Sequence, residues 1–192
     1  MKNSYLFLIV FSLLMAACKV DKNPVVLIET ESGNIEAEIF VKNAPITGAN
    51  FMQHVDSGTY NNGACFYRVV RMDNQPNNDV KIEVVQCGLY RSERRFPPIV
   101  HETTEMTGIK HTDGTLSMAR RDPGSANTEF SICIGDQPEL DYQGKRNPDG
   151  QGFAAFGRVT KGMDVARKIQ QQEDSGQYLV NPVVIRSIKR IR

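Results

Sequence analysis

The sequence predicts a single, mostly β domain that forms an antiparallel barrel or a sandwich. Short runs rich in valine and isoleucine recur along the chain, and turn residues such as those at 31–34 (ESGN) and 122–125 (DPGS) separate them. Eight such runs are found, at residues 25–30, 34–41, 66–71, 80–86, 115–120, 130–134, 155–159 and 183–189. Because no helical pattern intervenes at each step, antiparallel pairing is favoured over a parallel α/β sheet.

The run at residues 34–41 shows the strand period most clearly. Apolar residues at 35, 37, 39 and 41 alternate with mostly polar ones, as in a strand with one side in solvent. Two stretches have a helical pattern instead. Residues 44–55 begin with Pro45, which suits a first helical turn, and Phe51 and Val55 lie four apart on one face. Residues 162–171 form the second predicted helix, with the apolar positions 163, 165, 166 and 169 facing inward.

The N-terminal residues have the pattern of a signal peptide. Lys2 precedes an apolar run at residues 5–17, which is too short to span a bilayer core because spanning takes roughly 20 helical residues. Residues 14–18 (LMAAC) resemble a bacterial lipoprotein signal, with methionine where leucine is usual. We therefore expect residues 1–17 to be removed and Cys18 to carry the lipid. The alternative is an ordinary signal cut near Ala17 that leaves Cys18 unmodified.

A lipid on Cys18 would leave residues 18–24 as a tether before the domain, which spans residues 25–192. Seven extended residues reach at most about 25 Å, so the domain would act close to a membrane surface. Two or more acyl chains give stable anchoring, whereas one chain gives only marginal binding. The expected location is the bacterial cell envelope, facing the periplasm or the cell surface.

Charge and cysteine content narrow the possible partners. Removal of residues 1–17 takes away one of 23 basic residues and no acid, which makes the basic count equal to the 22 acidic residues. A neutral chain has no general field for nucleic acid. The histidines and cysteines have no metal-ligand spacing, and residues 150–152 (GQG) lack the strand–turn–helix setting of a dinucleotide site, so we expect no metal and no cofactor. Cys133 is expected as a buried free thiol, and a disulfide between Cys65 and Cys87 stays open.

Four segments in a fixed order carry a family resemblance. They are residues 66–70 (FYRVV), which contain Arg68, residues 82–86 (IEVVQ), which end at Gln86, and then residues 114–120 (GTLSMAR) and 155–159 (AFGRV). In this order and spacing the chain resembles the cyclophilin family of peptidyl-prolyl isomerases from about residue 25 to residue 188. The resemblance implies a closed eight-stranded antiparallel β-barrel capped by two α-helices.

The same resemblance implies roles for particular residues. Arg68 matches the catalytic arginine, and Gln86 matches the glutamine that holds the substrate backbone and supports that arginine. Ala119 and Arg120 match the edge that pairs with the substrate main chain, and Leu140 matches a leucine in the wall of the proline pocket. An arginine suits the reaction because it stays charged and its N–H groups form a rigid fork, which can donate to the prolyl nitrogen as the amide twists.

The proline pocket departs from the family pattern. Glu83 and Ser131 stand where phenylalanines are usual, and Val84 replaces a methionine. The other departures are Glu129 for a glutamine, Glu139 for an aromatic residue and Phe153 for a histidine. Each lost aromatic face removes on the order of 1.5–3 kcal/mol of burial, so we expect weak or altered proline binding. Phe130 or Phe153 could refill the space, and Glu83 or Glu129 could pair with Arg68.

Two functions therefore follow from the sequence. The first is a peptidyl-prolyl cis-trans isomerase, anchored to a membrane, that assists the folding of exported or unfolded proline-containing polypeptides. The second is a catalytically weak peptide-binding or chaperone module on the same fold. We expect a monomer in either case. Residues 141–152 form a longer loop than in the bacterial relatives, which could shape partner choice or be a surface insertion.

Overall fold

The structure is a computed structural model that describes residues 22–90 and 96–192. The predicted signal peptide and the lipid site at Cys18 lie outside the described residues. Within the described ranges, no helix combines the length and apolarity needed to cross a bilayer.

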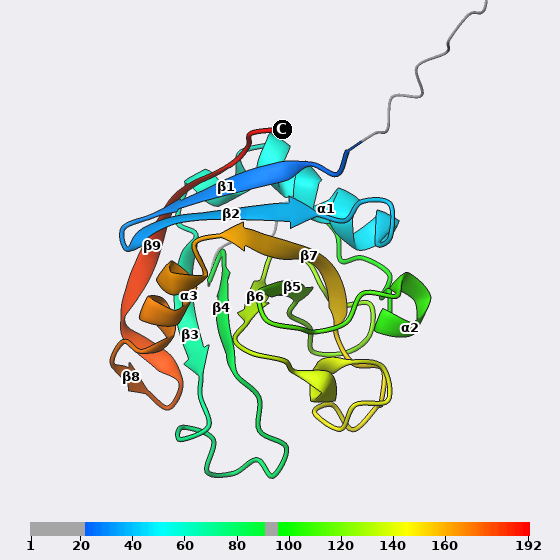
Figure 1. Ribbon diagram of the computed structural model, residues 1–192, viewed down its shortest axis with the longest axis vertical. Helices are drawn as coiled ribbons and strands as arrows, with labels where there is room; N and C mark the ends of the chain where they lie inside the picture. The colour runs from blue at the N-terminus through cyan, green and yellow to red at the C-terminus, as the bar shows by residue number, and fades with distance from the viewer. Residues whose placement is uncertain (1–21, 91–95) are drawn as a thin grey trace, which may run out of the picture.

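Eight antiparallel strands close into a barrel (Figure 1). In the order of the sheet they are β1 (Val25–Thr30), β2 (Gly33–Ile39), β7 (Ala154–Lys161), β5 (Thr115–Met118), β6 (Phe130–Cys133), β4 (Val84–Gly88), β3 (Cys65–Val70) and β9 (Tyr178–Arg190). Pairing of β1 with β9 closes the sheet, so the barrel is confirmed and the sandwich is excluded. Closure removes the free edges that an open sheet would expose.

The structure adds one short strand that the sequence pattern did not predict. β8 (Asp174–Ser175) pairs only with the start of β9 and forms a hairpin on the outside of the barrel. β9 therefore begins at Tyr178, five residues before the predicted strand at 183–189. Pro182 breaks the run of strand-forming residues in the sequence, and this hid the first part of β9.

Two predicted helices cap the barrel, as expected. They are α1 (Pro45–Asp56), which buries Phe51 and Val55, and α3 (Met163–Gln170), which buries Ala166 and Ile169. The four-residue α2 (Thr104–Thr107) was not predicted, and its N-terminus is capped by the Thr103 side chain. Short 3₁₀ turns occur at Thr59–Asn61 and Pro138–Leu140.

Apolar side chains form two separate clusters. The main core lies inside the barrel, where Phe51 contacts Phe130 with ring centroids 5.2 Å apart and Phe156 at 5.0 Å. A smaller outer cluster contains Val70, Ile82, Val84, Cys133 and Leu140, with Phe153 packed against it. Because side chains alternate along a strand, this outer cluster shares the outer face of β3 and β4 with Arg68 and Gln86.

All three cysteines in the described residues are free thiols. Cys133 is buried, as the sequence predicted, and Cys65 and Cys87 do not form the disulfide that the sequence left open. Burial raises the pKa of the Cys65 and Cys87 thiols, which makes both poor nucleophiles.

Candidate active site

The register of the sheet aligns four polar side chains on the outer face of the barrel. Arg68 of β3 lies opposite Gln86 of β4, Gln86 lies opposite Ser131 of β6, and Ser131 lies opposite Ser117 of β5. Residues directly opposite one another in antiparallel strands point to the same side. A polar row thus crosses four strands, and the two residues expected to act in catalysis stand together at one end.

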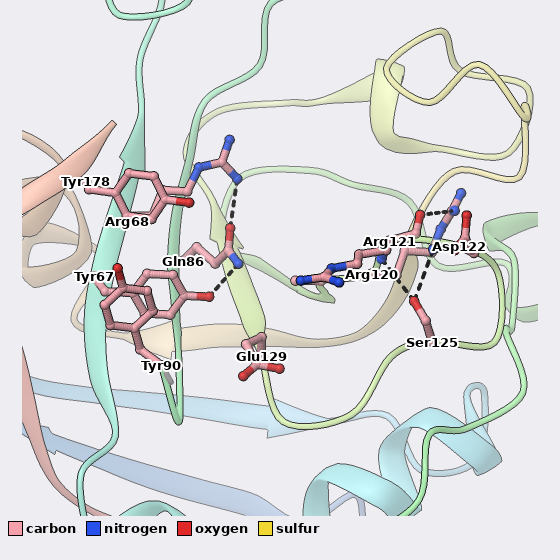
Figure 2. Close-up of a pocket in the computed structure, with 11 residues that line it drawn as sticks. Tyr67, Arg68, Gln86, Tyr90, Arg120, Arg121, Asp122, Ser125, Glu129 and Tyr178 are labelled. Carbon is pink, nitrogen blue, oxygen red and sulfur yellow. Dashed lines mark hydrogen bonds between the residues drawn. The ribbon is translucent and has the colours of Figure 1, made fainter. Parts of the chain in front are cut away.

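The Arg68 guanidinium is held by two glutamine side chains. Its Nη1 donates to Gln86 Oε1 at 2.9 Å, and its Nε and Nη2 donate to Gln177 Oε1 at 3.1 and 2.5 Å. Gln86 Nε2 in turn donates to the Tyr67 hydroxyl at 2.6 Å, and Figure 2 shows this chain from Arg68 to Tyr67. Both acceptors of Arg68 are neutral, so its position is fixed while its charge is kept.

Gln177 is a site residue that sequence reasoning missed. It lies in the turn of the β8–β9 hairpin with φ of 75°, a left-handed conformation that is costly for a residue other than glycine. Its backbone N–H donates to Asp174 Oδ1 at 3.1 Å and its Nε2 to the Asn74 carbonyl at 3.1 Å. Nothing in the local sequence identifies it, because the hairpin brings it to Arg68 across 109 residues of chain.

Asp174 stabilises the β8–β9 hairpin through hydrogen bonds to Arg71, Asn74 and the Gln177 backbone. Its carboxylate accepts from Arg71 Nη2 at 2.6 Å and from Asn74 Nδ2, and its side chain is 6% exposed. Burial alone would raise the pKa of Asp174, but hydrogen bonds from Asn74, Arg71 and the Gln177 backbone outweigh it, and the pKa is lowered. The ionised carboxylate thus helps to place Gln177.

A pocket of about 620 Å³ opens beside Arg68 and Gln86 (Figure 2). It is lined by Tyr67, Arg68, Gln86, Tyr90, Ala119, Arg120, Arg121, Asp122, Ser125, Glu129 and Tyr178. Tyr67 and Tyr90 stack with centroids 4.3 Å apart and planes 15° apart, which gives the pocket a flat aromatic wall. The predicted residues Ala119, Arg120 and Glu129 therefore line the same pocket as the predicted catalytic pair.

Three other predicted residues lie in the outer cluster. Val84 and Leu140 are only 4% and 3% exposed, and Phe153 packs against the same cluster. Ser131 is half-buried on the polar row beside them. These positions come together as the resemblance implied. Their apolar surfaces are buried against one another, however, so little apolar surface remains exposed to a ligand.

The structure contradicts the prediction that Phe130 contributes to the proline pocket. It is fully buried inside the barrel, where it packs on Phe51 and Phe156, so it neither contacts a substrate nor refills the pocket. Strand alternation is the reason: Ser131 faces outward from β6, and its neighbour must face the core.

The sequence left open an ion pair between Arg68 and Glu83 or Glu129, and the structure does not contain it. No carboxylate among the described residues forms an ion pair with Arg68. Glu83 Oε1 instead accepts from Gln170 Nε2 at 3.4 Å, while Glu129 lines the pocket next to Gln86. Arg68 is thus free of the competing acids that would hold it away from a substrate.

The Arg120 side chain supports a loop rather than an open edge. It donates to both carboxylate oxygens of Asp149, at 2.8 and 2.9 Å, and to the Gly152 carbonyl at 2.8 Å. It also lies over the Phe153 ring, 5.3 Å from the centroid. The hydrogen bonds from Arg120 lower the pKa of Asp149 to about 2. The hydrogen-bonding groups of the Arg120 side chain are therefore already occupied by the loop at 141–152.

Ser117, His111 and Asp141 form a hydrogen-bonded chain with a structural role. His111 lies 2.8 Å from Ser117 Oγ through Nε2 and 2.8 Å from Asp141 Oδ1 through Nδ1. Ser117 and His111 are 3% and 2% exposed, which leaves no access for a substrate at the hydroxyl. The described residues also contain no group of three histidine, cysteine or acidic side chains that could hold a metal ion.

The chain belongs to the family described as cyclophilin type peptidyl-prolyl cis-trans isomerase, whose family model matches residues 25–190. It is 37% identical over 177 residues to peptidyl-prolyl cis-trans isomerase A of Dickeya dadantii. That alignment covers 87% of this chain and 84% of the Dickeya protein. It is 34% identical over 148 residues to peptidyl-prolyl cis-trans isomerase B of Escherichia coli, over 76% of this chain and 83% of the other.

A solved structure shares the fold. It is the cyclophilin type isomerase of Cryptosporidium parvum crystallised in the presence of the dipeptide Ala-Pro, with a TM-score of 0.69 and 18% identity. The match covers 88% of this chain and 99% of that one. At this identity the likeness supports the barrel architecture alone.

Proposed function

We propose that the chain is a peptidyl-prolyl cis-trans isomerase with Arg68 as its catalytic residue and Gln86 as its partner on the substrate. The observation that carries the proposal is the state of the Arg68 guanidinium. It stands at the wall of a pocket, fixed by two neutral amides, and no described carboxylate neutralises it.

The proposed mechanism is electrostatic. The prolyl amide resists rotation because its C–N bond has partial double-bond character, and a donor that localises the nitrogen lone pair weakens that conjugation. A guanidinium has five N–H donors, and the two glutamines occupy three of them in Arg68. One N–H on each terminal nitrogen remains for the substrate. Because the donors are already oriented, little reorganisation is needed as the amide twists.

Arg68 alone does not account for efficient catalysis. A millionfold acceleration requires a barrier lower by about 8 kcal/mol, whereas a hydrogen bond to a charged group contributes about 1.5–3 kcal/mol. The remainder must come from positioning of the substrate along the aromatic wall of Tyr67 and Tyr90 and the backbone near Ala119.

A second candidate function is a peptide-binding module with little turnover. The observation that favours it is the outer cluster, where Val84 and Leu140 are almost fully buried and Ser131 replaces an aromatic floor. A proline ring would find little apolar surface there. Binding would then depend on the pocket beside Arg68 rather than on burial of the ring.

We further infer that the mature chain begins at a lipidated Cys18, acts in the bacterial cell envelope as a monomer and assists the folding of exported proteins. Residues 1–18 support this inference through their signal pattern. Mass spectrometry of the chain recovered from cell membranes is expected to find cleavage after Ala17 and acyl groups on Cys18. Recovery of Cys18→Ala in the same membrane fraction would contradict it.

Isomerisation of short peptides decides between the two functions. The full chain in mild detergent is expected to accelerate cis-to-trans conversion across a panel that varies the residue before proline. A folded protein that binds these peptides without accelerating any of them would establish the binding module instead. The same assay run on a refolding protein with a slow proline phase tests activity on a folding chain.

A further inference from the structure

A second pocket, of about 380 Å³, lies beside Arg68, the one residue that its lining shares with the first pocket. Three segments surround it: the connection from β3 to β4, the loop at 141–152 and the β8–β9 hairpin. Its lining residues are Arg68, Asn74, Gln75, Pro76, Asn77, Asn78, Arg146, Gly176 and Gln177. This lining contains two guanidinium groups and several amides but no aspartate or glutamate.

Arg146 carries the positive charge of this pocket together with Arg68. Its Nη1 donates to Gln75 Oε1 at 2.9 Å and to the Val80 carbonyl at 2.6 Å, and both acceptors are neutral. No described carboxylate forms an ion pair with Arg146. Burial and the nearby charge of Arg68 lower the pKa of Arg146, as expected for two like charges that lie close together without an acid between them.

We propose that this pocket binds the carboxylate of an aspartate or glutamate that flanks proline in the substrate polypeptide. The inference rests on the proposed function only in taking a proline-containing chain as the ligand. Arg68 belongs to both pockets, so a polypeptide that lies against Arg68 in the first pocket continues into the second. An acidic side chain there receives charge-assisted hydrogen bonds from the free donors of Arg146 and from the amides of the lining.

The two pockets differ in the charge that they offer. The first contains two acids, Asp122 and Glu129, which largely offset its three arginines, and one of those arginines, Arg120, is already paired with Asp149. The second has positive charge only, and part of it is shielded from water, so salt screens it less than a surface charge. We therefore expect the second pocket, rather than the first, to favour substrates with an acidic residue near proline.

The test measures binding and turnover separately on matched peptides. Fluorescent peptides with one proline carry glutamate at each of three positions before or after it, and each has a glutamine counterpart. For at least one position the full chain in mild detergent is expected to bind the glutamate peptide about tenfold more tightly than its counterpart, with a ratio that falls as salt is added. Equal affinity for every pair would overturn the proposal, whether or not the peptides are isomerised.

Three variants locate the effect. Arg146→Gln is expected to bring the ratio close to one, while Lys145→Gln, which removes the same charge from the exposed neighbouring residue, leaves it unchanged. Asn77→Asp places an acid in the lining without removing a described hydrogen bond, so it is expected to abolish or reverse the preference. A preference that survives both Arg146→Gln and Asn77→Asp would contradict this site. Absence of turnover with the preference intact would instead count against the isomerase alone.

Discussion

At the scale of single residues, the position of Arg68 depends on a side chain held in an unfavourable backbone conformation. Gln177 has φ of 75°, where a residue other than glycine costs about 1–3 kcal/mol. Its amide oxygen nevertheless accepts two hydrogen bonds from Arg68. Backbone strain concentrated at such a contact suggests that Gln177 positions Arg68, the proposed catalytic residue.

Gln177→Gly tests this positioning role. The variant loses the two bonds to Arg68 and the bond to the Asn74 carbonyl, but glycine tolerates the left-handed backbone, so relief of strain is expected to keep the thermal stability close to that of the wild type. We expect kcat/KM for a proline peptide to fall about tenfold, mainly in kcat. Gln143→Gly is the matched control, because Gln143 also has positive φ, of 64°, and has no described bond to Arg68. Equal kcat for Gln177→Gly and wild type would contradict the role.

Ser131→Phe tests whether the polar floor limits proline binding. Ser131 faces outward beside the outer cluster, and an aromatic ring there would add apolar surface worth on the order of 1.5–3 kcal/mol if a proline ring buries it. The KM of an Ala-Pro peptide is expected to fall about tenfold, with the melting temperature measured alongside. An unchanged KM in a variant as stable as the wild type would show that the floor does not limit affinity.

At the scale of elements, the β8–β9 hairpin places Gln177 and depends on a buried ionised group. Asp174 accepts hydrogen bonds from Arg71, Asn74 and the backbone of Gln177. Because the folded pKa is lowered, the unfolded chain binds more protons at acid pH. The stabilising contribution of Asp174 is therefore complete above the unfolded pKa, near 3.8, and is lost as pH falls through the lower folded pKa.

Asp174→Asn is expected to lower the free energy of unfolding by about 2 kcal/mol at pH 7, because the Arg71 guanidinium loses its charged acceptor. The difference between wild type and variant should shrink below pH 3.8 as Asp174 takes up a proton. Urea unfolding at several pH values measures it. The matched control is Asp73→Asn, which removes the exposed acid that also contacts Arg71 and should have little effect. A difference independent of pH would contradict the account.

The loop at 141–152 is an element whose role could not be predicted from sequence. Its length suggested either partner choice or a surface insertion, and the structure shows it bonded to the rest of the domain through Arg146 and Asp149. Arg120 binds Asp149, and Arg146 reaches across to Gln75 and Val80. These contacts join residues up to 71 positions apart, and no local pattern reports them.

At the scale of the whole molecule, the strand pattern predicted an antiparallel barrel or a sandwich, and the family resemblance carried by four segments selected the barrel. Alternation and turn residues located β1 to its exact ends, whereas Pro182 hid the start of β9. Arg68 and Gln86 could be named as candidate site residues from the sequence because each lies within a recognisable strand, and the structure places them opposite each other. Gln177 and Arg146 could not be found, because only closure of the barrel and packing of its loops bring them to Arg68.

In the proposed mechanism a fixed guanidinium, rather than burial of the proline ring, lowers the barrier to rotation. This mechanism is tested most directly by measuring isomerisation and peptide affinity together for Arg68→Ala and Arg68→Lys. We expect kcat/KM to fall about 100-fold or more in both variants, because lysine keeps the charge but lacks the fork that Gln86 and Gln177 bind. Peptide affinity should change by much less. Turnover in Arg68→Ala close to that of the wild type would contradict the account.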